Sequence, residues 1–160
     1  MNGFQGAGQG GIIEALRRAA ARLEEVLGEG FAGLVLFGSW ARGEAREDSD
    51  VDVMVVLKGV KGMEVRSRIY RVVAEEVGRP VTLIDVGLEE LGRECLEVTP
   101  LLLNTLYDGV VVFDRIGILE ELKERVARLV EKAGLVRYKT PDGKYGWKRV
   151  DGKPLEVVEA

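Results

Sequence analysis

Histidine is absent from this 160-residue sequence, and cysteine occurs only once, as Cys95. Without histidine the chain has no Ser-His-Asp or Cys-His catalytic set, no histidine metal ligand and no histidine pH switch. A single cysteine excludes an intramolecular disulfide and a cysteine metal cluster, and we expect Cys95 to be a small buried apolar residue. Catalysis by this chain would therefore depend on carboxylates, cations, hydroxyls and a hard metal ion.

The sequence also lacks a long apolar run. No segment approaches the roughly 18 residues needed to cross a bilayer, and the start MNGFQGAGQGG has neither the basic beginning nor the apolar centre of a signal peptide. We therefore expect a cytoplasmic protein without a membrane partner. The formal net charge of −4 argues against an extended nucleic-acid surface, although it allows a local basic pocket. Few Gln and Asn beside many Glu, Arg and Lys indicate a heat-adapted, thermophile source.

Helical and strand patterns alternate along a chain that is 46% hydrophobic and 31% charged, which is typical of a globular protein. Predicted helices span 12–27, 39–43, 62–79, 87–95, 99–109 and 118–133, and predicted strands 31–39, 48–57, 81–86 and 110–114, followed by a hairpin over 135–154. This order predicts an α+β (α/β-like) fold with helices packed on one sheet. We interpret residues 1–11 as a flexible tail, 12–114 as the main domain and 115–160 as a helix-and-hairpin extension packed on it.

The segment FGSWARGEAREDSDVDVMVV, residues 37–56, joins two predicted strands. Gly38-Ser39 lies at a strand-to-helix junction, where glycine allows close approach to the backbone and the helix start offers unpaired N–H groups to a phosphate. Arg42 shares a helix face with Ser39, and Arg46 extends this cationic edge, because guanidinium groups bind phosphate oxygens well. These residues predict a phosphate site. Taken alone, Gly38-Ser39 is also a typical helix N-cap, and Arg46 an ordinary partner of neighbouring acids.

Asp50 and Asp52 stand at the start of the second strand. Being two residues apart on a strand, their side chains point to the same side, with Cα atoms about 6.5–7 Å apart. Two carboxylates this close repel each other unless a cation lies between them, and hard oxygen ligands favour Mg²⁺. The pair therefore predicts a metal site, with a polar strand edge as the simpler alternative.

Gly38-Ser39, ten intervening residues and Asp50-Val51-Asp52 resemble the GS-x10-DxD signature of the DNA polymerase β-like nucleotidyltransferase superfamily. The fuller match GSWARGEAREDSDVDVMVV resembles its minimal nucleotidyltransferase branch, where G-S-x-A-R-G and S-D-x-D-hydrophobic are typical. With its neighbouring elements the resemblance extends over roughly residues 12–92. More loosely, LLNTLYDGVVVFD with the helix and aromatic hairpin after it looks like the end of archaeal members.

The resemblance implies a mixed central sheet with flanking helices, and Mg²⁺-dependent transfer of a nucleoside monophosphate, AMP from ATP in the first place, to a hydroxyl acceptor with release of pyrophosphate. It places Gly38, Ser39, Arg42 and Arg46 on the nucleotide, and it makes Asp50 and Asp52 the catalytic metal ligands.

Many members of this superfamily add a third carboxylate from the next strand, which activates the acceptor hydroxyl. Aligning RPVTLIDV with the pattern V-D-L-V places Thr82 where that aspartate would stand. Asp85 lies three residues further on, so that it faces the opposite side of a regular strand unless a bulge turns it inward. Asp85 is therefore the candidate for the third catalytic carboxylate.

Three functions fit these residues. In the minimal branch the acceptor is often a protein, such as a HEPN-domain toxin, and a HEPN active site needs a histidine, so the toxin would be a separate polypeptide. A non-catalytic, antitoxin-like or regulatory binding module is the first alternative, and Thr82 favours it. A small-molecule nucleotidyltransferase is the second, although the segment after Glu90 is short for an acceptor domain. The base preference, a homo-oligomeric state and the role of the hairpin, with Tyr138, Tyr145 and Trp147, stay open.

Overall fold

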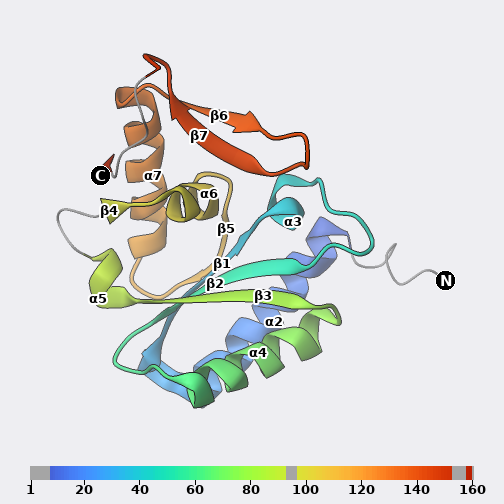
Figure 1. The fold of residues 1–160 in the computed structure, drawn as a ribbon. Helices are drawn as coiled ribbons and strands as arrows, with labels where there is room; N and C mark the ends of the chain where they lie inside the picture. The colour runs from blue at the N-terminus through green and yellow to red at the C-terminus, as the bar shows by residue number, and fades with distance from the viewer. Residues whose placement is uncertain (1–7, 93–96, 153–157, 160) are drawn as a thin grey trace.

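A four-stranded mixed sheet forms the centre of the protein (Figure 1). The computed structural model describes residues 8–92, 97–152 and 158–159. The strand order is β3-β2-β1-β5, where β1 is Phe31–Phe37, β2 is Val51–Leu57, β3 is Val81–Gly87 and β5 is Val110–Asp114. β1 pairs antiparallel with both β2 and β5, whereas β2 and β3 are parallel. The predicted α+β fold with a mixed sheet is confirmed.

Two long helices cover one face of this sheet. α2 (Gln9–Leu27) and α4 (Met63–Val77) pack side by side there, and α4 is the crossover that the parallel pair β2–β3 requires (Figure 1). Their apolar stripes meet alternate strand residues, which include Val51, Val53 and Val55 of β2. This layer holds the larger part of the core.

The other face is covered by the second half of the chain. α6 (Pro100–Tyr107), α7 (Ile118–Lys132) and the hairpin of β6 (Leu135–Lys139) and β7 (Tyr145–Arg149) pack over Met54 and Val56 of β2 (Figure 1). The remaining elements are η1 (Gly28–Gly30), α3 (Ser39–Arg42), α5 (Leu88–Leu91) and the paired short strands β4 (Glu97–Val98) and β8 (Val158–Glu159). The sheet is therefore buried on both sides, which explains why every residue of β1 is buried.

The predicted elements differ from the structure most clearly at two places. The first helix begins at Gln9 and not at residue 12, because the Gln9 side chain is tied to α3, so residues 9–11 are helix and not tail. The β4–β8 pair has no counterpart in the prediction. Cys95 lies outside the described residues. Among the helices that the structure describes, none combines the length and the apolar character that crossing a membrane requires.

Candidate active site

Gly38 and Asp52 fit against each other at the end of β1. Gly38 has φ 75° and ψ −157°, a conformation that is essentially restricted to glycine. In the β1–β2 register Phe37 lies opposite Asp52, which brings the Asp52 carboxylate alongside the next residue, Gly38. A Cβ atom at Gly38 would overlap Asp52 Oδ2 and stand 3.0 Å from its Cγ. Glycine is thus needed here for its backbone conformation and for the space that Asp52 occupies.

α3 follows directly and is held in place from outside. A helix of four residues has little stability of its own. The Gln9 side chain donates to the carbonyls of Trp40 and Ala41, each at 2.9 Å, and Trp40 Nε1 donates to Ser49 O at 3.2 Å. Trp40 is buried and packs within the core. Ser39 is the first residue of this helix, so its N–H group is one of those that helix geometry leaves unpaired.

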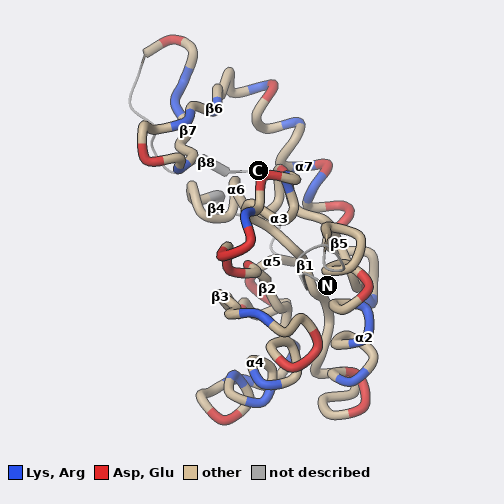
Figure 2. The backbone as a smooth tube through the Cα atoms, turned by 90° about the vertical axis from the view of Figure 1, so that its right-hand side faces the viewer, with Lys and Arg blue, Asp and Glu red and all other residues tan. Residues whose placement is uncertain are grey.

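Asp50 and Asp52 place two carboxylates at the N-terminal end of β2. Asp50 precedes β2 and is exposed, whereas Asp52 lies within β2 and is half-buried. Burial raises the pKa of Asp52, and the charge of Asp50 raises it further, while the Thr82 hydroxyl and the charge of Arg42 act in the opposite direction. Acidic residues are also dense along the connection from α3 to β2 (Figure 2). Two oxygen-donor side chains that repel each other in a half-buried setting suit a hard divalent cation, so these residues fit Mg²⁺.

Thr82, and not Asp85, stands beside this pair. Thr82 is opposite Asp52 in the β2–β3 register, and its Oγ1 lies 3.5 Å from Asp50 Oδ2. The strand runs regularly through Asp85, which therefore faces the α4 side of the sheet and forms an ion pair with Arg66. Among the described residues no group of three His, Cys, Asp or Glu side chains converges on a metal position. The assignment of Asp85 to the site is wrong.

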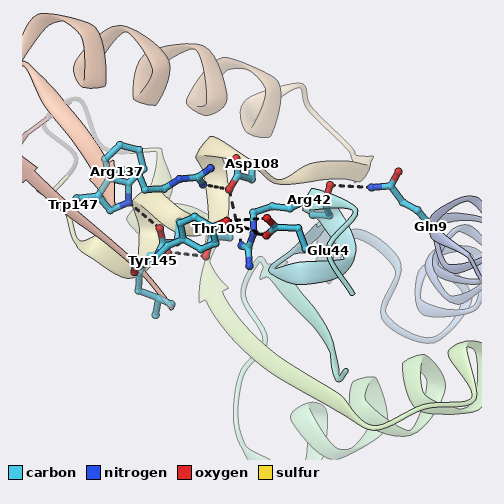
Figure 3. A network of polar contacts seen from close by, with 11 residues as sticks. Gln9, Arg42, Glu44, Thr105, Asp108, Arg137, Tyr145 and Trp147 are labelled. Carbon is cyan, nitrogen blue, oxygen red and sulfur yellow. Dashed lines mark hydrogen bonds and ion pairs between the residues drawn. The ribbon is translucent and has the colours of Figure 1, made fainter. Parts of the chain in front are cut away.

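Arg42 lies at the site but makes contacts that sequence reasoning did not predict (Figure 3). Its Nε donates to Glu44 Oε1 at 2.7 Å, its Nη1 lies 4.0 Å from Asp108 Oδ2, and its guanidinium is 4.4 Å from the centre of the Tyr145 ring. Asp108 also pairs with Arg137 of β6. Arg42 is thus held by side chains from three parts of the chain.

Arg46 belongs to the turn that leads back to β2. Its backbone N–H donates to Ser49 Oγ at 2.8 Å, and its residue is exposed. Within the part of the chain that the structure describes, its side chain makes no ion pair with an acid. The structure therefore does not place Arg46 on the Gly38–Asp52 site as it does Arg42.

The chain is similar in sequence to a known protein family and to two archaeal proteins. A model of the nucleotidyltransferase domain family matches residues 16–124. Two Methanocaldococcus jannaschii proteins named "Putative protein adenylyltransferase" are similar in sequence. MJ1305 is 25% identical over 114 residues, which are 69% of this chain and 78% of that protein. MJ0141 is 31% identical over 61 residues, which are 38% of this chain and 62% of that protein.

Two solved structures are similar in fold. One is a mutant MntA-HpeT toxin-antitoxin, with a TM-score of 0.51 and 14% identity over 72% of this chain and 87% of that one. The other is a toxin-antitoxin with AMP-PNP, with the same TM-score and coverage and 16% identity. At this identity the likeness concerns the fold.

Proposed function

The chain belongs to the nucleotidyltransferase domain family and is a minimal nucleotidyltransferase of the polymerase β-like superfamily, and from this premise we propose that it transfers AMP from ATP to a hydroxyl group with the help of Mg²⁺. The observation that carries the proposal is the placement of Asp52 against Gly38 at the start of α3, with Asp50 two residues before Asp52. A carboxylate pair for a cation and a glycine-lined helix start for phosphates lie there within one short stretch of chain.

Each residue of the site has a role in this reaction. Asp50 and Asp52 would hold the cation, which supplies positive charge to the triphosphate. The N–H groups at the start of α3 and the Ser39 hydroxyl donate hydrogen bonds to phosphate oxygens, and Arg42 contributes a fixed positive charge. The acceptor oxygen forms a bond to the α-phosphorus, the bond from that phosphorus to the β-phosphate oxygen breaks, and pyrophosphate and the hydroxyl proton leave. Thr82 is a weaker proton acceptor than a carboxylate, so we expect slow transfer.

A protein is the acceptor that we propose, in particular a HEPN-type toxin made as a separate chain. The names of the two archaeal relatives support a protein substrate and an adenylyl group. The similar fold of chains from toxin-antitoxin structures, one of them with AMP-PNP, supports a partner of this kind. The absence of histidine supports a division of labour between two polypeptides.

The test is transfer of label from α-labelled ATP with Mg²⁺ to the product of a neighbouring HEPN gene. Wild type should label the partner, and Asp50→Asn/Asp52→Asn should not. Asp85→Asn is the matched control, because it removes a carboxylate from the opposite face of the same sheet, and it should transfer at the wild-type rate. Transfer by the double variant, or its loss in Asp85→Asn alone, would contradict the assignment.

A non-catalytic antitoxin-like module is the second candidate, and one observation favours it. A threonine, Thr82, occupies the register position opposite Asp52, where a third carboxylate would complete the site. In that case wild type and Asp50→Asn/Asp52→Asn would bind the partner with equal affinity and neither would transfer label. The same experiment therefore separates the two candidates.

A further inference from the structure

The C-terminal hairpin reaches the candidate nucleotide site, and Tyr145 is its point of contact. Resting on the proposed function, we propose that Tyr145 is a positioning residue that holds the Arg42 guanidinium beside the Gly38–Asp52 edge, ready for the triphosphate. The hairpin is thereby a part of the active site and not only a covering layer.

Tyr145 acts on Arg42 through two contacts. The ring lies 4.4 Å from the Arg42 guanidinium carbon, within the range of a cation–π interaction. The Tyr145 hydroxyl also donates to Glu44, at 3.1 Å from Oε1 and 2.9 Å from Oε2, and Glu44 Oε1 accepts from Arg42 Nε. Tyr145 thus contacts both the face of the Arg42 guanidinium and the Glu44 carboxylate that orients this guanidinium (Figure 3).

Holding a long, flexible arginine side chain in one conformation favours its binding to a ligand. Such a side chain loses rotamer entropy whenever it binds a ligand. In this protein the Arg42 side chain is only 17% exposed and is already held. The Arg42 backbone N–H donates to the Gly38 carbonyl at 3.2 Å, so the residue lies one helical turn from Gly38. Arg42 is thus oriented before a nucleotide arrives.

The hairpin that carries Tyr145 is anchored to α6, so it can hold Arg42 in place. Trp147 is buried, and its Nε1 donates to Asn104 Oδ1 of α6 at 2.8 Å. The Asn104 amide in turn donates to the Tyr145 carbonyl at 3.4 Å. The Trp147 ring packs edge-on against Tyr107 at 5.1 Å. The backbone at Tyr145 is therefore tied to α6 and does not depend on Arg42 for its place.

A second arginine completes the cluster. Arg137 of β6 also lies 4.4 Å from the Tyr145 ring centre and pairs with Asp108. Asp108 thus lies between two guanidinium groups, since Arg42 Nη1 is 4.0 Å away. Glu44 accepts from Arg42 Nε at 2.7 Å, so Asp108 is a second carboxylate beside Arg42, one that it shares with Arg137.

Tyr138 provides a matched control on the same hairpin. It lies on β6, is opposite Gly146 in the register and is 42% exposed, with Lys148 at 5.8 Å from its ring. It belongs to the face that points away from α6, whereas Tyr145 and Trp147 share the inner face. Tyr138→Leu therefore changes the same kind of residue in the same hairpin without touching Arg42.

The first test measures positioning without any nucleotide. The Arg42 Nε–H signal in a ¹⁵N–¹H spectrum, assigned by its loss in Arg42→Gln, reports its hydrogen bond and the nearby ring. Tyr145→Leu should shift this signal and speed its exchange with water, Tyr145→Phe should give an intermediate effect, and Tyr138→Leu should leave it unchanged. An unchanged signal in Tyr145→Leu overturns the proposal, whatever the enzyme does.

The second test measures binding of the unreactive analogue AMP-PNP with Mg²⁺. Tyr145→Leu should weaken binding about tenfold, because an arginine that is no longer held loses more rotamer entropy when it binds the phosphates. Tyr145→Phe should recover most of this loss. In an Arg42→Gln background, Tyr145→Leu should add less than about twofold, because the residue that it positions is gone. Equal losses in both backgrounds contradict the positioning role. Failure of wild type to bind AMP-PNP at all would instead contradict the proposed function, and the spectrum would still decide the role of Tyr145.

Discussion

Gly38→Ala is the substitution that tests the geometry of the site most directly. Alanine at φ 75°, ψ −157° is strained, and a residue forced into that region costs of the order of 1–3 kcal/mol. The added Cβ would also overlap Asp52 Oδ2 and lie 3.0 Å from its Cγ and 3.2 Å from its Cβ, so the Asp52 carboxylate has to move. Adding roughly 1 kcal/mol for this displacement, we expect a total loss of about 2–4 kcal/mol.

Urea unfolding followed by tryptophan fluorescence measures this loss, because Trp40 and Trp147 are both buried. With a slope of roughly 2 kcal/mol per molar, the midpoint should fall by about 1–2 M. Mg²⁺-dependent transfer should also be lost, since the displaced carboxylate is a proposed metal ligand.

A double-mutant cycle separates the two causes. In Gly38→Ala/Asp52→Ala the carboxylate is gone and only the backbone strain remains, so the destabilisations should sum to about 1 kcal/mol more than the double variant shows. Strict additivity would refute the steric contact with Asp52. Wild-type stability of Gly38→Ala would refute the backbone argument as well.

Three further substitutions test the carboxylate edge. Asp52→Asn should stabilise the protein at pH 7 by about 1 kcal/mol. The reason is that the Asp50 and Asp52 charges, about 7 Å apart, repel by roughly 0.6–2.4 kcal/mol, where the range covers aqueous and surface dielectric constants. Thermal melts should show a rise in melting temperature of about 2–4 °C. Since burial raises the pKa of Asp52 in the folded state, its ionised form costs stability above its unfolded pKa, and this gain should vanish below about pH 4. Thr82→Asp should lower the melting temperature measured without metal. Added Mg²⁺ should then raise the melting temperature by more than it does in wild type, and the transfer rate should increase. An unchanged response to Mg²⁺ would contradict the place assigned to Thr82. Asp85→Asn should leave transfer unchanged and cost less than about 1 kcal/mol in melts, because its ion pair with Arg66 is about one-third exposed.

The part of the site that could be predicted is local in the chain. Gly38, Ser39, Asp50 and Asp52 lie on two paired strands and the single connection between them. Strand periodicity alone brings the two aspartates to one side, and it also directs Asp85 to the other. Strand periodicity therefore separates Asp85 from the carboxylate pair, and the regular β2–β3 register agrees with this separation.

The part that could not be predicted depends on contacts between distant segments. Tyr145 and Glu44 are 101 residues apart, and their contact exists only because Trp147 seats the hairpin on α6. No periodicity reports such a placement, although the aromatic residues of the hairpin were a usable signal. The early start of α2 was missed for a similar reason, because a glycine-rich segment has low helix propensity and only the contact of Gln9 with α3 favours helix there.

That contact has a consequence for how the site meets its ligand. Gln9 holds the carbonyls of Trp40 and Ala41, so α3 takes its shape when the protein folds and needs no anion to induce it. Ordering four loop residues at the moment of binding would cost several kcal/mol, at about 1–2 kcal/mol each. In this chain that entropy is lost in advance, and the site is preorganised. An anion that approaches the start of α3 should therefore associate without waiting for a conformational change.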